Sequence, residues 1–280
     1  MTGPDPIRRY RTLFLSDVHL GSKAAAATEL LDFLRVHDAE TIYLVGDIVD
    51  GWRLKRAWHW PQAHNDVVQK LLRKSRKGTR IVYVPGNHDE FLRDFPGEHF
   101  GGIEVRLDDI HKTADGRRFL VMHGDEFDIV VRNARLIAAL GDWAYDAAIA
   151  FNGVFNRVSR RLGFRYWSFS SWAKLKVKNA VSFIAAFETA LAAEAARRGC
   201  DGVICGHIHH AEIANRAGMT YVNTGDWVES RTAVAERFDG SLELIRWEVA
   251  EETVPAAPAR GWRFGRGAPA TLPAALGEAA

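Results

Sequence analysis

Carboxylate, imidazole and amide side chains recur in five short motifs along the chain. These motifs are Asp17-Val18-His19, Gly46-Asp47-Ile48-Val49-Asp50, Gly86-Asn87-His88-Asp89, His123-Gly124-Asp125 and Gly206-His207-Ile208-His209. A lone histidine or a single Gly-Asp pair is usually structural, so the joint pattern carries the argument. In extended backbone, residues two apart point to the same side, and each Asp-x-His or His-x-His pair can therefore reach one cation. Carboxylates, imidazoles and an amide oxygen suit Mn, Fe or Zn, with Mg possible.

The candidate ligands outnumber the needs of one tetrahedral ion. They suffice for two divalent ions that share a carboxylate and a water.

Each motif follows a short apolar run that is typical of a buried strand. The runs cover residues 13–15, 41–45, 81–84, 119–122 and 202–205, and a further run at 220–222 precedes Asn223. Helical spacing of apolar residues appears between the early runs, over 24–36 and 65–74. Strands that alternate with helices predict an α/β fold, in which ligands bind beyond the carboxyl ends of the strands. The motifs stand at those ends.

The second half of the chain is organised differently. Residues 129–200 read as a helical insertion, with Gly199 expected to end its last helix. Residues 232–238 and 242–249 read as a hairpin, because Asp239-Gly240 between them suits a tight primed turn. We therefore expect one domain over residues 1–250, with a lid at 129–200, and a flexible Pro-, Ala- and Gly-rich tail over 251–280.

The composition narrows the function classes. The 280 residues carry a formal net charge of +2, which gives no reason to expect a nucleic-acid partner. Two cysteines, Cys200 and Cys205, are too few for a disulfide scaffold. The amino terminus lacks the apolar core of a signal peptide, and no apolar stretch is long enough to span a membrane. These features favour a cytoplasmic protein, and nothing in the sequence assigns its oligomeric state.

The five motifs, in this order, resemble those of the calcineurin-like metallophosphoesterase superfamily. The resemblance implies a layered α/β sandwich that holds two metal ions about 3.5–4 Å apart. It implies that Asp47 bridges the ions. One ion would also take Asp17, His19 and His209, and the other Asn87, His123 and His207.

The resemblance also implies the chemistry. Hydroxide would attack phosphorus in line, and His88 would donate a proton to the leaving oxygen. Asp50 looks like the partner that orients His88, although it could simply cap a turn. Asp89 and Asp125 look like supporting residues outside the ligand set.

The insertion bears on the substrate. Over residues 129–180 it has nine basic residues, two acidic residues and many aromatic residues. A basic and aromatic cover suits an anionic substrate with apolar parts, or a membrane interface; it could also be a helical cap with a small core of its own. Together with the stretches around the motifs, this lid resembles the UDP-2,3-diacylglucosamine diphosphatase group.

That group implies hydrolysis of UDP-2,3-diacylglucosamine to UMP and diacylglucosamine 1-phosphate in lipid A biosynthesis, usually with manganese. It implies a protein that is peripheral on the inner face of the membrane, with Lys174, Lys176 and Lys178 as candidate phosphate contacts. The best-known members carry Arg where this chain has His88. A related enzyme that acts on another phosphodiester or lipid pyrophosphate therefore stays open. So does a scaffold of the same fold that performs no chemistry.

Overall fold

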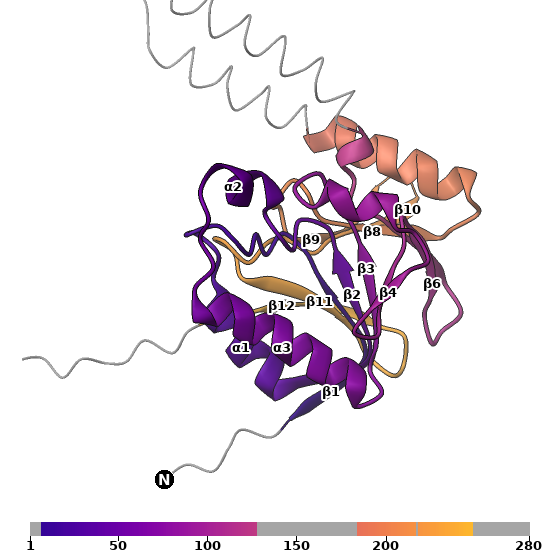
Figure 1. Ribbon diagram of the computed structural model, residues 1–280. Coiled ribbons are helices and arrows are strands. Elements are labelled where there is room, and N and C mark those ends of the chain that lie inside the picture. The colour runs from indigo at the N-terminus through magenta and orange to yellow at the C-terminus, as the bar shows by residue number, and fades with distance from the viewer. Residues whose placement is uncertain (1–6, 128–183, 217, 249–280) are drawn as a thin grey trace, which may run out of the picture. The chain divides into compact units, whose positions relative to one another are not determined.

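Two β-sheets stacked face to face form the centre of the protein (Figure 1). The computed structural model describes residues 7–127, 184–216 and 218–248. The first sheet has the strand order β12-β11-β1-β2-β3-β5-β4. Its strands are β1 (Arg8–Leu15), β2 (His37–Val45), β3 (Arg80–Val84), β4 (His99–Phe100), β5 (Ile103–Val105), β11 (Thr232–Glu236) and β12 (Leu242–Arg246).

The second sheet has five strands in the order β6-β7-β8-β10-β9. They are β6 (Asp109–Lys112), β7 (Arg118–Val121), β8 (Gly202–Cys205), β9 (Glu212–Arg216) and β10 (Met219–Asn223). Strands β1, β2, β3 and β5 run parallel in the first sheet, as do β7, β8 and β10 in the second. Antiparallel strands complete both sheets at their edges.

Helices cover the outer faces of the sandwich. Helices α1 (Ala27–Val36) and α3 (Gln62–Arg76) pack side by side on the first sheet (Figure 1). Residues 184–197, the last part of the expected insertion, are helical and pack on the second sheet. Gly199 follows this helix with a φ of +67°. The short elements are α2 (Gly51–Arg56) and the 3₁₀ turns η1 (Glu90–Asp94) and η2 (Asp125–Phe127).

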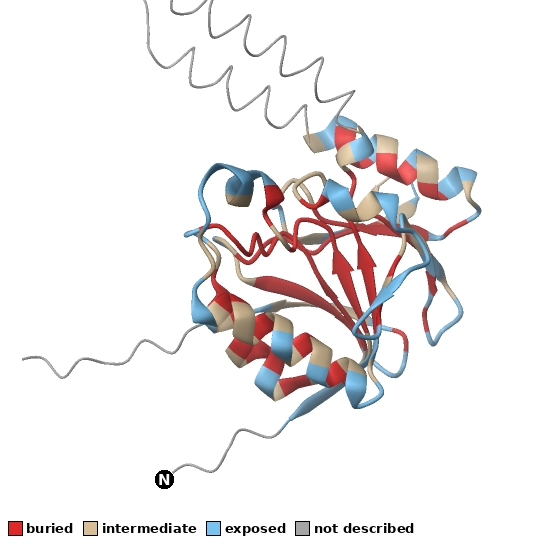
Figure 2. Ribbon diagram, in the orientation of Figure 1, coloured by how far each residue is buried: buried red, intermediate tan, exposed pale blue. Residues whose placement is uncertain are grey.

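Side-chain alternation along the strands builds three apolar layers. On β1, Leu13 and Leu15 pack toward the helix layer, whereas Phe14 between them joins the core between the two sheets. On the second sheet, Leu120 and Val203 face the helix at 184–197. The central strands are buried on both faces, as the red ribbons of Figure 2 show. The layered α/β sandwich is therefore confirmed.

The expected strands all form, but several elements were missed. Strands β4, β6 and β9 are short edge strands, and β5 is a three-residue strand between β3 and β4. The mixed sequences of these four strands have no continuous apolar run. The hairpin of β11 and β12 has a different turn from the one expected. Phe238, Asp239 and Gly240 form a three-residue loop closed by an Arg237–Ser241 backbone hydrogen bond, and Gly240 has a φ of +88°. A three-residue loop with a left-handed glycine is a common alternative to the two-residue primed turn.

Some expectations fall on residues outside the described ranges. These are most of the expected lid, residues 129–183, with Lys174, Lys176 and Lys178, and the tail over 251–280. Within the described ranges, no helix combines the length and the apolar character needed to cross a bilayer.

Candidate metal centre

The sequence motifs converge at one edge of the sandwich. They follow β1, β2, β3, β7 and β8, whose carboxyl ends all point to this edge because the strands run parallel within their sheets. Six of the seven expected ligands fall into groups whose ligand atoms lie within 4.8 Å of one another: Asp17/His19/His209, Asp47/His123/His207 and His19/Asp47/His88. Residues from five separate segments thus face a single small volume.

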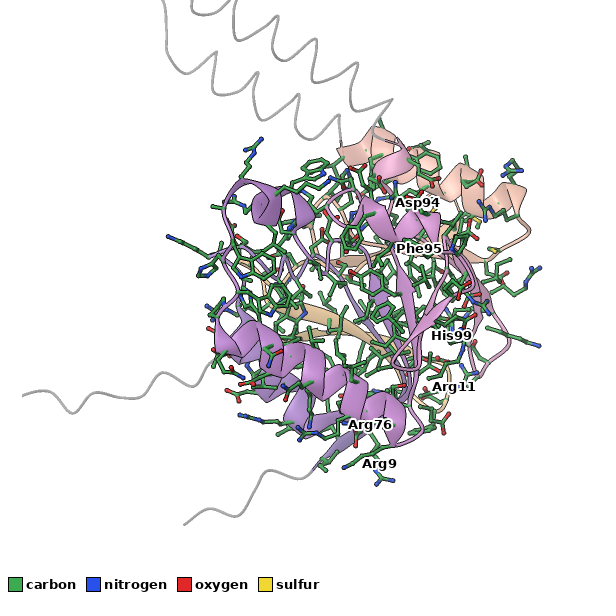
Figure 3. The ribbon with its side chains drawn as sticks, in the orientation of Figure 1. Arg9, Arg11, Arg76, Asp94, Phe95 and His99 are labelled. Carbon is green, nitrogen blue, oxygen red and sulfur yellow. The ribbon has the colours of Figure 1, made fainter. Side chains whose placement is uncertain are left out.

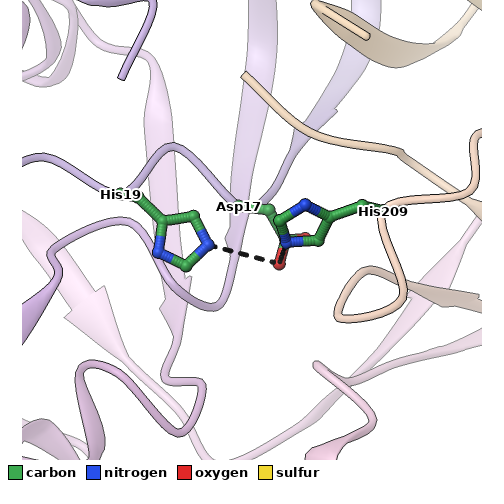
Figure 4. Close-up of side chains that lie close together, drawn as sticks. All are labelled: Asp17, His19 and His209. Atoms are coloured by element: carbon green, nitrogen blue, oxygen red, sulfur yellow. Dashed lines mark ion pairs between the residues drawn. The ribbon is translucent and has the colours of Figure 1, made fainter. Parts of the chain in front are cut away.

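The first group joins the ends of β1 and β8. The Nε2 atom of His209 lies 3.1 Å from Asp17 Oδ1, and the Nε2 atom of His19 lies 4.0 Å from the same oxygen (Figure 4). Two imidazole nitrogens therefore flank one carboxylate oxygen. This arrangement could hold one cation.

The second group surrounds Asp47. Its Oδ2 atom is 3.4 Å from His123 Nε2 and 3.9 Å from His19 Nε2, so the carboxylate stands between the two groups. The rings of His123 and His207 are 5.1 Å apart. Asp47 therefore has the position of a ligand that two cations could share.

Left-handed backbone is concentrated at these residues. Asp17, His19, Asp47, His207 and His209 have φ angles between +51° and +71°. Among the described residues, only Arg231 joins them as a non-glycine residue with positive φ. Such conformations cost free energy and are held by their surroundings, which is typical of functional sites.

Backbone hydrogen bonds hold the two loops that carry Asp17, His19 and Asp47. The Asp17 amide donates to the Gly46 carbonyl at 3.0 Å, and the His19 amide donates to the Asp47 carbonyl at 2.8 Å. The loops after β1 and β2 are therefore fixed to each other next to the candidate ligands.

Two glycines give the side chains room to approach. A Cβ on Gly46 would lie 2.1 Å from His123 Nδ1, and a Cβ on Gly206 would lie 2.4 Å from Asp17 Oδ2. Neither distance is possible for a real side chain, so the glycines of these motifs are required by close packing against the ligands. Gly46 also has a φ of +76°, which glycine adopts at no steric cost.

Several polar atoms of the cluster are buried without a hydrogen bond. Among the described residues, His19 Nε2, Asn87 Oδ1 and His123 Nε2 have no hydrogen-bond partner. A buried polar group without a partner costs about 1–3 kcal/mol, and native proteins leave few of them. All three are lone-pair donors suited to a divalent cation. The donor set therefore fits the metal ions that the motifs imply.

Supporting contacts aim these atoms at the centre. His123 Nδ1 lies 2.9 Å from the carbonyl oxygen of Val45, which accepts a hydrogen bond from it and turns Nε2 toward Asp47. The backbone amide of His88 donates to Asp47 Oδ1 at 2.8 Å, and that of His207 donates to Asp17 Oδ2 at 3.0 Å. Contacts of this kind orient metal-binding side chains and set their protonation.

Electrostatic coupling between Asp47 and His123 is strong. Burial alone would raise the pKa of Asp47 and lower the pKa of His123, but their attraction reverses both effects. The pKa of Asp47 lies well below its usual range, and that of His123 is raised to about 10. A cation placed between them would compete with the His123 proton, because metals bind neutral imidazole.

His88 lies beside the two groups and is held by Asp50. Its Nδ1 atom is 3.0 Å from Asp50 Oδ1, and its Nε2 atom is 3.9 Å from Asp47 Oδ2. Asp50 also caps α2 by accepting the amide of Arg53 at 2.9 Å, and its Oδ2 lies 3.5 Å from His19 Nδ1. Asp50 thus both caps α2 and contacts the ring of His88, so the two interpretations of this residue are compatible.

Trp52 is a neighbour of the site that the sequence analysis did not identify, whereas Asp89 was expected to support the site. The Trp52 ring lies 4.3 Å from the ring of His88, and Trp52 is 43% exposed. Asp89 is fully buried and accepts hydrogen bonds from the amides of Ile48 and Gly86, at 2.8 and 2.5 Å, and from the Tyr83 hydroxyl. Asp89 therefore ties the loop of Asp47 to the loop of Asn87. The Gly-Asp-x-x-Asp-Gly-Trp order was visible in the sequence, but the contacts of Trp52 with His88 and of Asp89 with Ile48 join residues about 40 positions apart.

Asp125 has a comparable supporting place. Its Oδ1 atom accepts a hydrogen bond from Arg93 Nη2 at 2.6 Å, and the same guanidinium reaches the Pro85 carbonyl at 3.1 Å. Arg93 thus connects the segments that precede Asn87 and follow His123.

Comparison with known proteins agrees with the motifs. A sequence profile of the calcineurin-like phosphoesterase family matches residues 10–211. A UDP-2,3-diacylglucosamine hydrolase of Xanthomonas campestris pv. campestris is 30% identical over 249 residues, which cover 84% of this chain and 98% of that protein. A protein of the same name from Stenotrophomonas maltophilia is 28% identical over 255 residues, 85% of this chain and 99% of that one.

Among solved structures, Vps29 from Entamoeba histolytica superposes with a TM-score of 0.40 at 14% identity. The superposition covers 85% of this chain and 99% of that chain.

Proposed function

Because the chain belongs to the calcineurin-like phosphoesterase family, we propose that it hydrolyses the pyrophosphate of a lipid-like nucleotide sugar. The proposed reaction converts UDP-2,3-diacylglucosamine to UMP and diacylglucosamine 1-phosphate. The chain is a metal-dependent hydrolase, and the choice of substrate rests on its similarity to UDP-2,3-diacylglucosamine hydrolases over nearly their whole length. In this role it acts in lipid A biosynthesis.

In this proposal two cations are held by the convergent cluster. Asp17, His19 and His209 hold one, Asn87, His123 and His207 hold the other, and Asp47 contacts both. Bound divalent ions acidify water and neutralise charge on phosphoryl oxygens. Manganese is the proposed metal, because the diphosphatase group that the chain resembles usually uses it. The mixed donor set of carboxylates, imidazoles and an amide oxygen also suits Fe and Zn, with Mg possible.

His88 serves as the proton donor to the leaving oxygen. Asp50 accepts a hydrogen bond from His88 Nδ1, so the ring is fixed and Nε2 is left to face the reacting group. A proton on Nε2 can then pass to the oxygen that leaves phosphorus. Asp50 acts through His88 by holding its orientation. The tilted contact with Trp52 limits rotation of the same ring.

The substrate and location follow from the same proposal. Lys174, Lys176 and Lys178 contact substrate phosphate, and the surrounding basic and aromatic segment covers the acyl chains. The enzyme is cytoplasmic and peripheral on the inner face of the membrane, where a lipid-linked substrate resides. Its partner is that substrate, and no nucleic acid takes part.

A second candidate activity is favoured by one residue. The best-known members of the diphosphatase group carry Arg at the position of His88, which faces the leaving group. A related phosphoesterase that cleaves another phosphodiester or lipid pyrophosphate would use the same metals and the same histidine.

The deciding experiment is hydrolysis by the purified protein with added Mn²⁺. We expect UDP-2,3-diacylglucosamine to release UMP, detected by mass spectrometry, and chelation to abolish the release. Bis(p-nitrophenyl) phosphate is assayed in parallel. Turnover of this diester without release of UMP would overturn the proposed substrate and support the second activity. No turnover of either compound with any of the four metals would overturn both activities.

A further inference from the structure

The residues that follow Asp50 form a basic and aromatic surface, which we call the α2 segment (Gly51–Trp60). Trp58 is 77% exposed, more than any other large apolar side chain in the described part of the chain. Lys55 and Arg56 are also exposed, and no acidic residue occurs between positions 51 and 65. Figure 2 shows α2 and its neighbouring loop largely in pale blue. An isolated exposed leucine needs no explanation, but a fully presented tryptophan among cations does.

The α2 segment is anchored, so its exposed side chains are held outward by the fold. Leu54 packs on Gly21, where an added Cβ would lie 2.7 Å from Leu54 Cγ. Trp60 packs against the apolar core between the first sheet and its helices. Asp50 caps the helix. Trp58 therefore protrudes from a fixed turn, with its ring 6.3 Å from that of Trp60.

The cations of the α2 segment are largely uncompensated. Within the described residues, neither Lys55 nor Arg56 makes an ion pair, whereas Arg53 lies 3.4 Å from Asp50. A second nearby acid, Glu90, contacts Trp52 and neither of these two cations: its Oε1 accepts a weak hydrogen bond from Trp52 Nε1 at 3.4 Å. The surface around Trp58 thus carries net positive charge that an anionic partner could neutralise.

We propose that the α2 segment docks on an anionic lipid bilayer. Trp58 enters the interfacial region, because the indole ring is apolar but carries an N–H that needs a polar partner. Lys55 and Arg56 contact anionic headgroups, which attract each surface cation. Tryptophan flanked by basic residues is the combination that binds peripheral proteins to such interfaces.

Docking there would place the candidate metal centre at the lipid surface. The α2 segment begins immediately after Asp50, and its Trp52 touches His88. A lipid-linked phosphoester could then reach the centre while its acyl chains stay near the bilayer. This role in bringing a lipid-linked substrate to the centre rests on the proposed function, but bilayer binding itself can be measured without any turnover.

The carboxyl-terminal end of α3 provides a matched control. Arg73, Arg76 and Lys77 make it as basic as the α2 segment, and all three are exposed. Arg76 is labelled in Figure 3, at the end of the view away from α2. This end of α3 has no exposed aromatic side chain of its own. If charge alone attracted the protein to lipid, the two surfaces would contribute equally.

The first experiment measures co-sedimentation with phosphatidylglycerol/phosphatidylcholine vesicles. Lys55→Gln/Arg56→Gln should weaken binding by about 25-fold, roughly fivefold for each cation. Trp58→Ala should weaken it by about tenfold. Arg76→Gln/Lys77→Gln should leave binding within about twofold of the wild type. All variants should hydrolyse bis(p-nitrophenyl) phosphate at the wild-type rate if the wild type does so, because none of these residues touches the site.

The second experiment locates the contact. Both native cysteines are buried, so Ala57→Cys offers a single exposed thiol for an environment-sensitive fluorophore. Its emission should rise and shift to the blue with anionic vesicles, and should change little with pure phosphatidylcholine. The same fluorophore attached at Arg76→Cys should remain in water, so its emission should change little with either kind of vesicle.

Three results would overturn the proposal. They are equal loss of binding in the α2 and α3 variants, a label at position 57 that ignores anionic vesicles, and a Trp58→Ala variant that binds vesicles normally but loses thermal stability. The last result would mean that Trp58 packs against another part of this chain. Vesicle binding with no hydrolysis of lipid substrate would support the surface and count only against the proposed function.

Discussion

Two buried polar clusters occupy the same sandwich and differ in how far their hydrogen bonds are satisfied and in backbone conformation. At the carboxyl ends of the strands, Asp17, His19, Asp47 and His123 are buried. Among the described residues, the Nε2 atoms of His19 and His123 have no hydrogen-bond partner. Toward the other end of β1, Glu236 is also fully buried, but both of its oxygens are satisfied.

The Glu236 cluster is complete by itself. Oε1 accepts hydrogen bonds from Arg11 Nη1 at 2.5 Å and the Ala114 amide at 2.8 Å. Oε2 accepts from Thr12 Oγ1 and His111 Nε2, each at 2.8 Å. Four donors thus surround one carboxylate, and none of these residues has left-handed backbone.

The difference separates a structural cluster from a functional one. Burial of charge alone does not mark a site, because Glu236 is as buried as Asp17. Polar atoms without hydrogen-bond partners, together with strained backbone, do mark a functional site. Both features lower the stability of the fold, so folding alone does not explain them. The comparison predicts that the first cluster controls activity and the second controls stability.

The largest expected effect comes from Asp47→Asn. The amide keeps the size of the side chain and an acceptor for the His88 amide, but removes the charge that two cations would share. Hydrolysis of the best substrate should fall by about 10⁴-fold or more, which corresponds to several kcal/mol of barrier. Metal content by plasma mass spectrometry should fall as well. Unchanged turnover would remove the basis for the comparison.

His88→Ala should lower turnover by about 10²- to 10³-fold, because proton donation to the leaving oxygen is lost. Both metal ions should stay bound, since His88 is outside the proposed ligand set. Metal analysis alongside kcat checks this separation. The loss of one ion in the variant would make His88 a ligand and contradict its assigned role.

Glu236→Gln should act on stability alone, by about 2 kcal/mol in urea unfolding at pH 7. The glutamine has one acceptor oxygen for the four donors that surround Glu236, so some donors lose their partner. Specific activity of the folded protein should equal that of the wild type. A loss of activity without a loss of stability would break the distinction between the clusters.

The pH dependence of unfolding is a second test of the stabilising role of Glu236. Burial alone would raise the pKa of Glu236, but hydrogen bonds from His111, Thr12 and Ala114 hold it below its usual range. A depressed pKa adds stability above the unfolded value, about 4.3, and that stability is lost as the pH falls through the folded value. The difference between wild type and Glu236→Gln should therefore shrink below about pH 4.

Local patterns in the sequence account for much of the fold. The central strands and the helices α1 and α3 were predictable because apolar runs and helical spacing act over a few residues. Strands β4, β5, β6 and β9 were not, because short strands at or next to a sheet edge are stabilised by their neighbours and need no apolar run. The sequence shows a tryptophan at position 58, but it does not show that this side chain is exposed.

The sequence alone determined which side chains could meet and where each stands along its strand. Motif order and strand ends are local properties, so Asp17, Asp47 and His123 could be placed at one edge from the motifs themselves. Only the tertiary structure decided how they meet: that Val45 orients His123, that Asp50 reaches both His88 and His19, and that Asp89 joins two loops. Those contacts depend on sheet register and on the approach of segments far apart in the chain, which residue types and spacing do not encode locally.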